Sequence, residues 1–424
     1  MSPEAHPAGE TPEALIPPSG QAYRIYVVLC AGFLVSQFYR VSNAVIAPEL
    51  MRELAISAEA MGVVAGIYFL AFAAVQLPTG LILDRFGPRR TMAGLFLVAV
   101  AGSATFATAG GFLGLVLGRA LMGVGCAAGL MGSLVAISRW FPATRFAWLS
   151  SLLFTVGGAG LLLATTPLAA VAATVGWRGA FGLMAAVTAV VAVLLYGVVR
   201  DAPGDTTGRD GRRESAGEMW RGLRAVMGNR QLQYVCAIQF VNYGTVLAVA
   251  GLWAGPYLND VHGLEGVARG NVLLVLNIAM LAGVMAFSAV ARWLGSLRRA
   301  IAGGATASVI LLLLLAALPG LTLGPAVALL VLFGLVSAYV MLIHAHARAV
   351  LPSHLVGRGL TLQNLAVFLG VFVMQALSGL IVGVFQGPGG MAPEAAYRAV
   401  FGFLALGTAV ALLVYVRSDE PRGA

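Results

Sequence analysis

Arg40 is the residue of this chain whose type and position most clearly indicate a binding function. It lies in a long apolar stretch, with Ser36, Gln37 and Asn43 at −4, −3 and +3 on the same helical face. An arginine inside a membrane span costs about 2.5–3.5 kcal/mol, so it usually faces a cavity and has partners. Its planar guanidinium suits a carboxylate, phosphate or nitrate. These four residues predict an anion site, and a charge satisfied by neighbouring carbonyls or hydroxyls is the alternative.

Two further apolar stretches carry polar side chains at helical spacing. Gln239, Asn242 and Tyr243 share a face at i, i+3 and i+4, and Asn364 lies in register with Phe368. We expect Gln239, Asn242, Tyr243 and Asn364 to contribute to the same substrate site. The alternative is hydrogen bonding between helices, because polar side chains also join membrane helices to one another.

Arg119, His344 and His346 are the other ionisable residues inside apolar stretches that could balance or move a charge. The two histidines lie two positions apart and so point to different faces of a helix, which argues against a metal site. No Asp or Glu occupies the middle of an apolar stretch, so a carboxylate proton carrier is not expected. Arg119, His344 and His346 are therefore the candidates for coupling, with helix packing and a solvated helix end as the alternatives.

The composition places these residues in a membrane protein. Of 424 residues, 59% are hydrophobic and 10% are charged, whereas soluble domains are about 45–50% apolar and about 25% charged. All 26 basic residues are arginines, and the net charge is +9. In so apolar a chain this surplus indicates loop charge beside a lipid bilayer, not a nucleic-acid partner. The three cysteines lie in apolar stretches, so neither a disulfide framework nor a metal centre is predicted, and no cofactor is expected.

Twelve membrane-spanning helices account for the apolar stretches. A span needs about 20 apolar residues to cross about 30 Å of hydrocarbon. The predicted spans are 23–50, 59–82, 91–109, 112–138, 148–174, 180–199, 232–258, 268–291, 300–318, 324–348, 360–386 and 398–416.

The arginines are unevenly divided between the two sets of loops. The loops on the side of the two chain ends hold 20 of the 26, the opposite loops hold Arg52, Arg178, Arg269 and Arg398, and two lie inside spans. Since cytoplasmic loops of membrane proteins are rich in basic residues, both ends are expected in the cytoplasm.

The chain divides into two related halves. Residues 200–231 form the one long polar stretch inside the chain and are expected to be a cytoplasmic linker between a six-helix half at 23–199 and another at 232–416, with tails at 1–22 and 417–424. Pro48 and Pro256 stand 208 positions apart near the ends of the first and seventh spans, and Gly87 and Gly295 follow the second and eighth at the same shift. Such duplication is a transporter arrangement, with the site between the halves. The fold class predicted is an all-α membrane protein of two pseudo-symmetric halves.

One loop carries a more specific pattern. The segment Gly80-Leu-Ile-Leu-Asp84-Arg85-Phe-Gly87-Pro88-Arg89-Arg90 resembles the signature of the major facilitator superfamily, between the second and third helices. Pro88 departs from the usual basic residue. The segment from Arg119 to Ala128 is similar to the helix-four motif of that family, with Met122 where glutamine is common.

The resemblance implies roles for these residues. The acid matching Asp84 meets the start of helix eleven, here near Gly357–Thr361, where the helix dipole favours an anion. It implies that Asp84 and Arg85 form a gate that closes the cytoplasmic side, with Gly80, Gly87, Arg89 and Arg90 shaping the loop. Arg119 matches an arginine that is often tied to proton coupling in the family.

The first helix is similar to that of the organic-phosphate and related anion exchangers of the superfamily, which carry an arginine at this spacing before a proline. Those exchangers pair it with a second basic residue in helix seven, where this chain has Ala248. A doubly charged phosphate ester is therefore a poorer match than a smaller anion.

The sequence as a whole predicts a monomeric transporter of a small solute in the bacterial inner membrane, with an organic or inorganic anion as substrate and an antiporter among the expected modes. Alternating access of the two halves would move the substrate. Multidrug or metabolite efflux is the alternative. A membrane enzyme is not expected, because the spans lack a cluster of catalytic acids or a nucleophile with its base.

Overall fold

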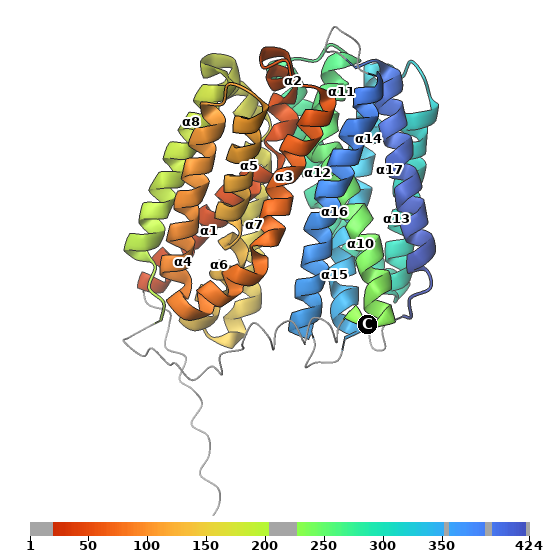
Figure 1. Cartoon of the computed structure of the whole chain (residues 1–424). Helices are drawn as coiled ribbons and strands as arrows, with labels where there is room; N and C mark the ends of the chain where they lie inside the picture. Colours follow the sequence, from red (N-terminus) through yellow and green to blue (C-terminus); the bar gives the residue numbers. More distant parts are fainter. Residues whose placement is uncertain (1–19, 203–226, 352–355, 386–391, 421–424) are drawn as a thin grey trace, which may run out of the picture.

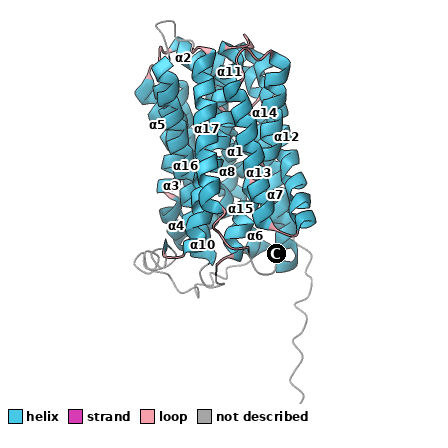
Figure 2. Cartoon of the chain, turned by 90° about the vertical axis from the view of Figure 1, so that its right-hand side faces the viewer, coloured by secondary structure: helices cyan, strands magenta, loops and turns pink. Residues whose placement is uncertain are grey.

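The computed structural model describes residues 20–202, 227–351, 356–385 and 392–420, and within these ranges it contains helices and no strand (Figures 1 and 2). The first half consists of α1 (Gly20–Val41), α2 (Asn43–Glu53), α3 (Ala58–Ala74), α4 (Gln76–Ala107), α5 (Phe112–Cys126), α6 (Gly129–Trp140), α7 (Ala143–Leu163) and α8 (Thr166–Val198). The second half consists of α10 (Arg230–Ala248), the π-helical turn η1 (Val249–Trp253), α11 (Ala254–Asp260), α12 (Gly266–Leu294), α13 (Leu297–Ala317), α14 (Leu323–Ser337), α15 (Val340–Ala349), α16 (Val356–Phe385) and α17 (Glu394–Tyr415).

These elements make twelve crossings, as the sequence predicts. Eleven helical stretches in the described ranges are long and apolar enough to span a membrane, and the shorter apolar helix Ala58–Ala74 accounts for most of the second crossing. Two elements include a tight turn, at Gly87 in α4 and Gly176 in α8, where φ is +76° and +71°. Glycine tolerates this left-handed backbone because it has no Cβ. Most of the predicted linker, residues 203–226, lies outside the described ranges.

Six crossings are interrupted in the described residues, which the sequence analysis did not predict. The second is interrupted at Val75 and the fifth at residues 164–165. The first is interrupted at Ser42, the fourth at residues 127–128, the tenth at residues 338–339, and the seventh by η1. Ser42 and η1 correspond at the 208-residue shift, and the interruptions of the fourth and tenth crossings differ by about 210 positions. The two halves therefore share these four breaks as well as their helix order, whereas the breaks at Val75 and at residues 164–165 have no counterpart in the continuous helices α12 and α16. Interrupted helices commonly form the binding sites of transporters.

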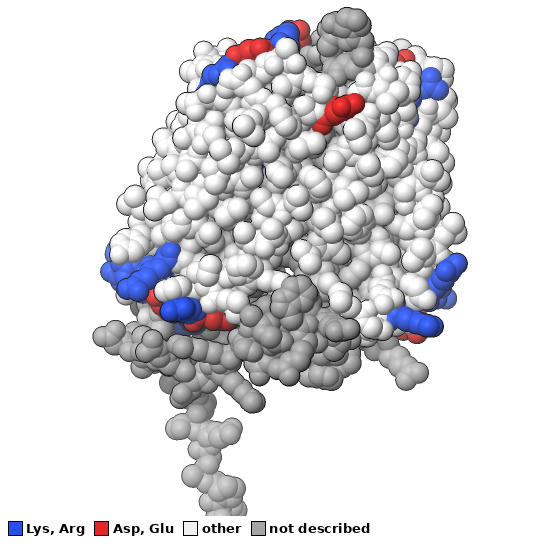
Figure 3. All heavy atoms as spheres, in the orientation of Figure 1, with Lys and Arg blue, Asp and Glu red and all other residues white. Residues whose placement is uncertain are grey.

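The molecule has two ends with different packing. We call the end where α1 begins and α8 and α17 end the tail face, and the opposite end, with α2 and α11, the far face (Figure 1). Charged side chains gather near both ends, and a broad band between them is uncharged (Figure 3). This band matches the part of the surface that lipid would cover, since lipid-exposed charge is costly.

The two halves pack most closely toward the far face. A Cβ on Gly255 of α11 would overlap the carbonyl oxygen of Ala44 in α2, and one on Gly62 of α3 would lie 2.6 Å from the carbonyl oxygen of Gln375 in α16. A Cβ on Gly270 of α12 would lie 2.9 Å from the Cβ of Ala169 in α8. By contrast α6 and α15, near the tail face, pack against elements of their own halves. The structure is therefore a state that is closed at the far face.

We expect Gly255→Ala to open the far face, because the added methyl group requires α2 and α11 to separate. Labels on the exposed residues Arg52 and Glu265, in a chain without its native cysteines, would report a longer distance. Gly251→Ala is the matched control, since a Cβ at Gly251 meets its nearest neighbour at an ordinary 3.7 Å. Equal distances in the two variants would contradict this account of the closure.

Candidate functional site

Arg40 lies at the boundary between the two halves, near the end of α1. Its guanidinium carbon is 5.1 Å from the ring centroid of Phe72 in α3 and 5.2 Å from that of Phe368 in α16. The two rings touch, with centroids 4.5 Å apart. These are cation–π contacts, in which the positive charge is attracted to the electron-rich ring face. The predicted anion-binding residue is thus held by one aromatic ring from each half.

The guanidinium of Arg40 makes no hydrogen bond or ion pair with the described residues. Its Nε atom is buried without a partner. The N–H bonds of the guanidinium lie in its plane, and an aromatic ring is a poorer acceptor of their hydrogen bonds than an oxygen atom. Because a buried donor without a partner is costly, the side chain is set up to receive an acceptor from outside.

Several side-chain amides in the first, seventh and eleventh crossings are also buried without a hydrogen-bond partner among the described residues. Asn43 is 0% exposed, and Gln239 and Asn242 are 0% and 1% exposed. Both amide atoms of each of these three side chains lack a hydrogen-bond partner, as does Oε1 of Gln37. Native proteins satisfy most buried polar groups, so a group of unsatisfied ones indicates a place for a ligand or water.

The packing brings part of this set to a common depth. Gly370 of α16 lies against the carbonyl of Phe240 in α10, so Gln239 and Phe368 are at similar heights in the bundle. A Cβ added at Gly251 of η1 would lie 3.8 Å from the carbonyl oxygen of Arg40. Tyr243 and Asn364 are half-buried on the same two helices. The structure therefore places Gln239 at about the depth of Phe368, and it brings η1 of the second half against the helix that carries Arg40.

Ser36 and Gln37 also pack within the first half. Ser36 is buried against Gly129, at the start of α6. The aliphatic part of Gln37 lies against Gly157 and Gly160 of α7. Ser36 therefore faces the interrupted fourth crossing, and Gln37 approaches the fifth with its amide oxygen unpaired.

Arg119 is fully buried and bonded to the backbone. Its Nη1 donates to the carbonyl of Tyr39 at 2.7 Å and its Nη2 to the carbonyl of Ala65 at 3.5 Å. Its guanidinium carbon also lies 4.8 Å from the ring centroid of Tyr68. The Tyr39 carbonyl is next to the break at Ser42, so Arg119 supports the interrupted helix that carries Arg40. These contacts favour the alternative interpretation of Arg119, in which it joins helices to one another and does not take part in coupling.

Sequence reasoning did not consider Gln363 or the rings beside Arg40, and it noted Gln375 only as lying in register with Phe368, together with Asn364. Gln363 is fully buried with both amide atoms unpaired, and Gln375 uses its nitrogen to bond the Leu247 carbonyl at 3.0 Å while its oxygen has no partner. The rings of Phe72 and Phe368 were hidden among the many aromatic residues of apolar spans. A search for every amide inside a predicted span would have found Gln363.

The signature loop is held by an acid that the sequence analysis did not consider. Asp201, just after α8, accepts a hydrogen bond from the Arg89 backbone N–H at 2.9 Å, and its carboxyl contacts Gly87. The Arg89 side chain donates to the Tyr196 carbonyl at 2.7 Å. The Asp201 carbonyl accepts from Arg139 at 3.4 Å. We call these contacts the Asp201 collar; it joins α4, α6 and α8 within one half.

The other gating candidates lie at the surface of the tail face. Asp84, Arg85 and Arg90 are exposed, and Gly80 is half-buried with open space beside it. Arg85 stacks on Phe86, and Asp84 forms no ion pair with any residue that the structure describes. The predicted partner region, Gly357–Thr361, begins with residues whose side chains lie outside the described part. The contact between them stays a prediction.

His346 is buried, and it fastens the end of the chain to the second half. Its Nδ1 is 2.6 Å from the Tyr415 hydroxyl, and its Nε2 is 3.2 Å from the Asp419 carbonyl. Gln231 exchanges two hydrogen bonds with Asp419, and Ser296 donates to Glu420 at 2.6 Å. We call these contacts the C-terminal collar. His344 is half-buried, and its Nδ1 has no partner.

The far face is joined by an ion pair between the halves. Arg269, at the start of α12, is 1% exposed and donates to the Glu49 carboxylate at 2.6 Å and to the Val45 carbonyl at 2.5 Å. The second acid of α2, Glu53, instead binds Trp177 and Arg178 of its own half. The hydrogen bond from Trp177, together with Arg178, lowers the pKa of Glu53. Thus α2 is fastened to both halves by different carboxylates.

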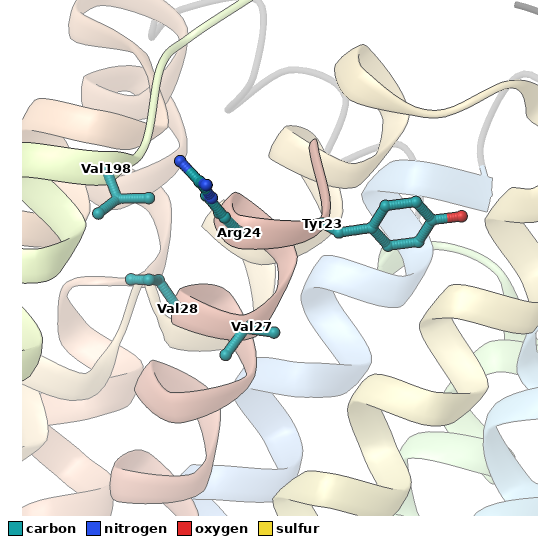
Figure 4. A pocket seen from close by; sticks show the side chains of 5 residues that line it. All are labelled: Tyr23, Arg24, Val27, Val28 and Val198. Atoms are coloured by element: carbon teal, nitrogen blue, oxygen red, sulfur yellow. The ribbon is translucent and has the colours of Figure 1, made fainter. Parts of the chain in front are cut away.

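A surface hollow lies away from this boundary. Tyr23, Arg24, Val27 and Val28 of α1 and Val198 of α8 line it near the tail face (Figure 4). Its lining is apolar except for Arg24 and Tyr23, and it shares no residue with the group around Arg40.

A comparison with known protein families decides the identity of this fold. The model of the Major Facilitator Superfamily matches residues 28–343. The chain belongs to the Major Facilitator Superfamily. The family consists of membrane transporters and not of enzymes, and the long apolar helices of the described residues are those of a multi-pass membrane protein.

Several members of the superfamily resemble this chain. A Cupriavidus necator protein named "Probable sulfoacetate transporter" is 24% identical over 277 residues, which cover 62% of each chain. The Bacillus subtilis hexuronate transporter is 23% identical over 235 residues, or 55% of each. The matched regions thus span about three fifths of these relatives. In fold, the chain resembles an inward-facing bacterial homologue of the lysosomal transporter Spinster, with a TM-score of 0.74, 16% identity and coverage of 94% and 96%.

In a superfamily member that alternates between two states, the Arg269–Glu49 pair should stabilise only the far-face-closed one. We expect Arg269→Gln to lengthen the Arg52–Glu265 label distance and to lower the melting temperature, because a buried ion pair is expensive to break. Arg178→Gln is the control, since it removes an exposed pair within one half. If both variants kept the wild-type distance, the pair would have no role in closing the far face.

Asp84 should act in the opposite state. We expect Asp84→Asn to favour the state described above, because the exposed carboxylate contributes no ion pair to it. Labels at Ala143 and Arg348, which are exposed at the tail face of the two halves, would then show a larger fraction at long distance. Transport should slow while expression stays normal. An unchanged distance distribution with normal uptake would remove the gate assignment.

Proposed function

We propose that this transporter carries a small anion, organic or inorganic, and that Arg40 binds the negative charge. The observation that carries the proposal is the half-buried Arg40 side chain, whose Nε is buried without a partner and whose guanidinium has no acidic or hydrogen-bonding partner among the described residues. An anion entering from water would supply the partner that the protein lacks, and charge-assisted hydrogen bonds are the stronger kind. The unpaired amides of Asn43, Gln239 and Asn242 would bind the rest of the solute.

We further propose that the tail face is cytoplasmic in a bacterial inner membrane. Among the described residues, the tail face carries most of the arginines, which supports this orientation. The far-face-closed structure is then an inward-facing state, and alternating access would expose Arg40 to either side in turn. One chain contains both halves of the site, so we propose a monomer.

The names of relatives favour an anionic substrate. Sulfoacetate, hexuronate and nitrate or nitrite appear in the names of proteins that this chain resembles. No Asp or Glu lies in the middle of a predicted span to carry a proton. The transport modes that we propose are therefore exchange of one anion for another or facilitated diffusion. Arg119 is bonded to backbone carbonyls, and the seventh crossing has Ala248 where the anion exchangers have a second basic residue, so a small anion fits better than a doubly charged phosphate ester.

Efflux of a more apolar compound is the second candidate. The observation that favours it is the aromatic group beside Arg40, in which the ring of Phe368 contacts those of Phe69 and Phe72. An apolar compound would bind the ring faces and would tolerate the loss of the guanidinium.

Substitution of Arg40 separates these two candidates. We expect Arg40→Lys to weaken anion binding, because lysine keeps the charge but loses the planar fork. Arg40→Ala should cost about 2–5 kcal/mol if the contact is desolvated. Gln239→Ala should cost less, and Arg24→Gln, at the exposed start of α1, should cost nothing. Calorimetry with sulfoacetate, glucuronate and nitrate would measure these losses.

The opposite outcome is equally specific. If the tightest ligand proves cationic or apolar, or binds Arg40→Ala as well as wild type, the anion proposal fails and the efflux candidate takes its place. Thermal stability of each empty variant provides the folding control.

A further inference from the structure

We infer that Phe368 is a positioning residue that couples the charge of Arg40 to the conformation of the carrier. The inference rests on the proposed function, because it gives the anion bound by Arg40 a role in releasing the empty resting state. Phe368 belongs to the second half and Arg40 to the first, so the contact between them crosses the boundary that must move.

The surroundings of Phe368 place it in the far-face closure as well as in the site. Its ring contacts Phe72 at 4.5 Å and stacks on Phe69 with centroids 6.2 Å apart. On the same two helices, Gly66 lies against Phe372 and Gly62 against Gln375. Opening the far face requires α3 and α16 to separate along this contact. The ring of Phe368 must then leave both Phe72 and Arg40.

The ring of Phe72 behaves differently, because it lies in the same half as Arg40. Rocking of the halves moves Phe72 and Arg40 together, so their contact can persist in both states. Of the two rings beside the guanidinium, therefore, only Phe368 gives it a stabilisation that exists in the far-face-closed state alone.

This arrangement makes the empty carrier prefer the closed far face. Without an anion, the unpaired charge of Arg40 is attracted to the faces of both rings. A bound anion neutralises that charge and weakens the attraction, while the N–H groups of the guanidinium donate to the anion. Substrate binding thus removes part of the free energy that holds α16 against α3. A ligand shifts a conformational equilibrium through such a difference between states.

The experiment measures the distance between labels at Arg52 and Glu265 in the empty protein, with the native cysteines replaced. We expect Phe368→Leu to raise the ratio of far-face-open to far-face-closed molecules by about 2- to 30-fold, which corresponds to the usual range of cation–π energies. Phe368→Tyr keeps the ring and should resemble wild type. Repeating Phe368→Leu in an Arg40→Gln background isolates the part that depends on the charge, and there the shift should shrink.

Two single variants serve as matched controls. Phe69→Leu removes a ring that stacks on Phe368 but has no contact with Arg40, so its shift should be the same with and without Arg40. Phe72→Leu removes the ring that lies in the same half as Arg40. It should shift the equilibrium between far-face-open and far-face-closed molecules of the empty protein less than Phe368→Leu does. If Phe368→Leu caused equal shifts in the wild-type and Arg40→Gln backgrounds, the contact would be packing alone and the inference would be overturned.

Adding an anion gives a second readout. Saturating glucuronate or nitrate should move wild type toward the far-face-open state and should move Phe368→Leu less. If either anion binds through Arg40 while Phe368→Leu shows no charge-dependent shift, the positioning role fails and the proposed function stands. If the charge-dependent shift occurs in the empty protein but no anion binds, the proposed function fails and the positioning role stands.

Discussion

A positive charge without an acidic partner in the apolar interior is the constraint on which the arrangement of this transporter depends. The proposed role of Arg40 requires that its charge be stabilised in that interior when the site is empty and still be available to a solute. A permanent carboxylate partner would satisfy the first need and defeat the second. Two aromatic rings satisfy both, because they stabilise the cation without occupying its N–H groups.

The helix that carries Arg40 is adapted to this position. The break at Ser42 lies two residues after Arg40, and Arg119 donates to the nearby Tyr39 carbonyl. One buried arginine thus supports the backbone so that the other can remain available. The interruption in η1, at the equivalent place of the other half, carries no charged residue, so the proposed site takes its charge from the first half alone.

Sequence reasoning succeeded where a property is local. The spans follow from the length of apolar runs, the glycine turn after the second crossing follows from the Gly87 motif, and Arg40 stands out as a charge in an apolar segment. The breaks at Ser42 and residues 127–128 and the rings beside Arg40 depend on contacts between distant segments. Asp84 attracted attention through its motif, whereas Asp201, 112 residues after Arg89, is the acid that bonds the loop in this state.

The Asp201 collar and the C-terminal collar have a mechanical consequence. Each fastens the tail-face ends of several helices of one half, with an acidic residue that follows the last helix of that half. A body fastened at its base turns as a lever and does not shear helix by helix. A small separation of α2 from α11 at one end is thereby converted into a displacement across the whole thickness of the membrane, without either half losing its internal order.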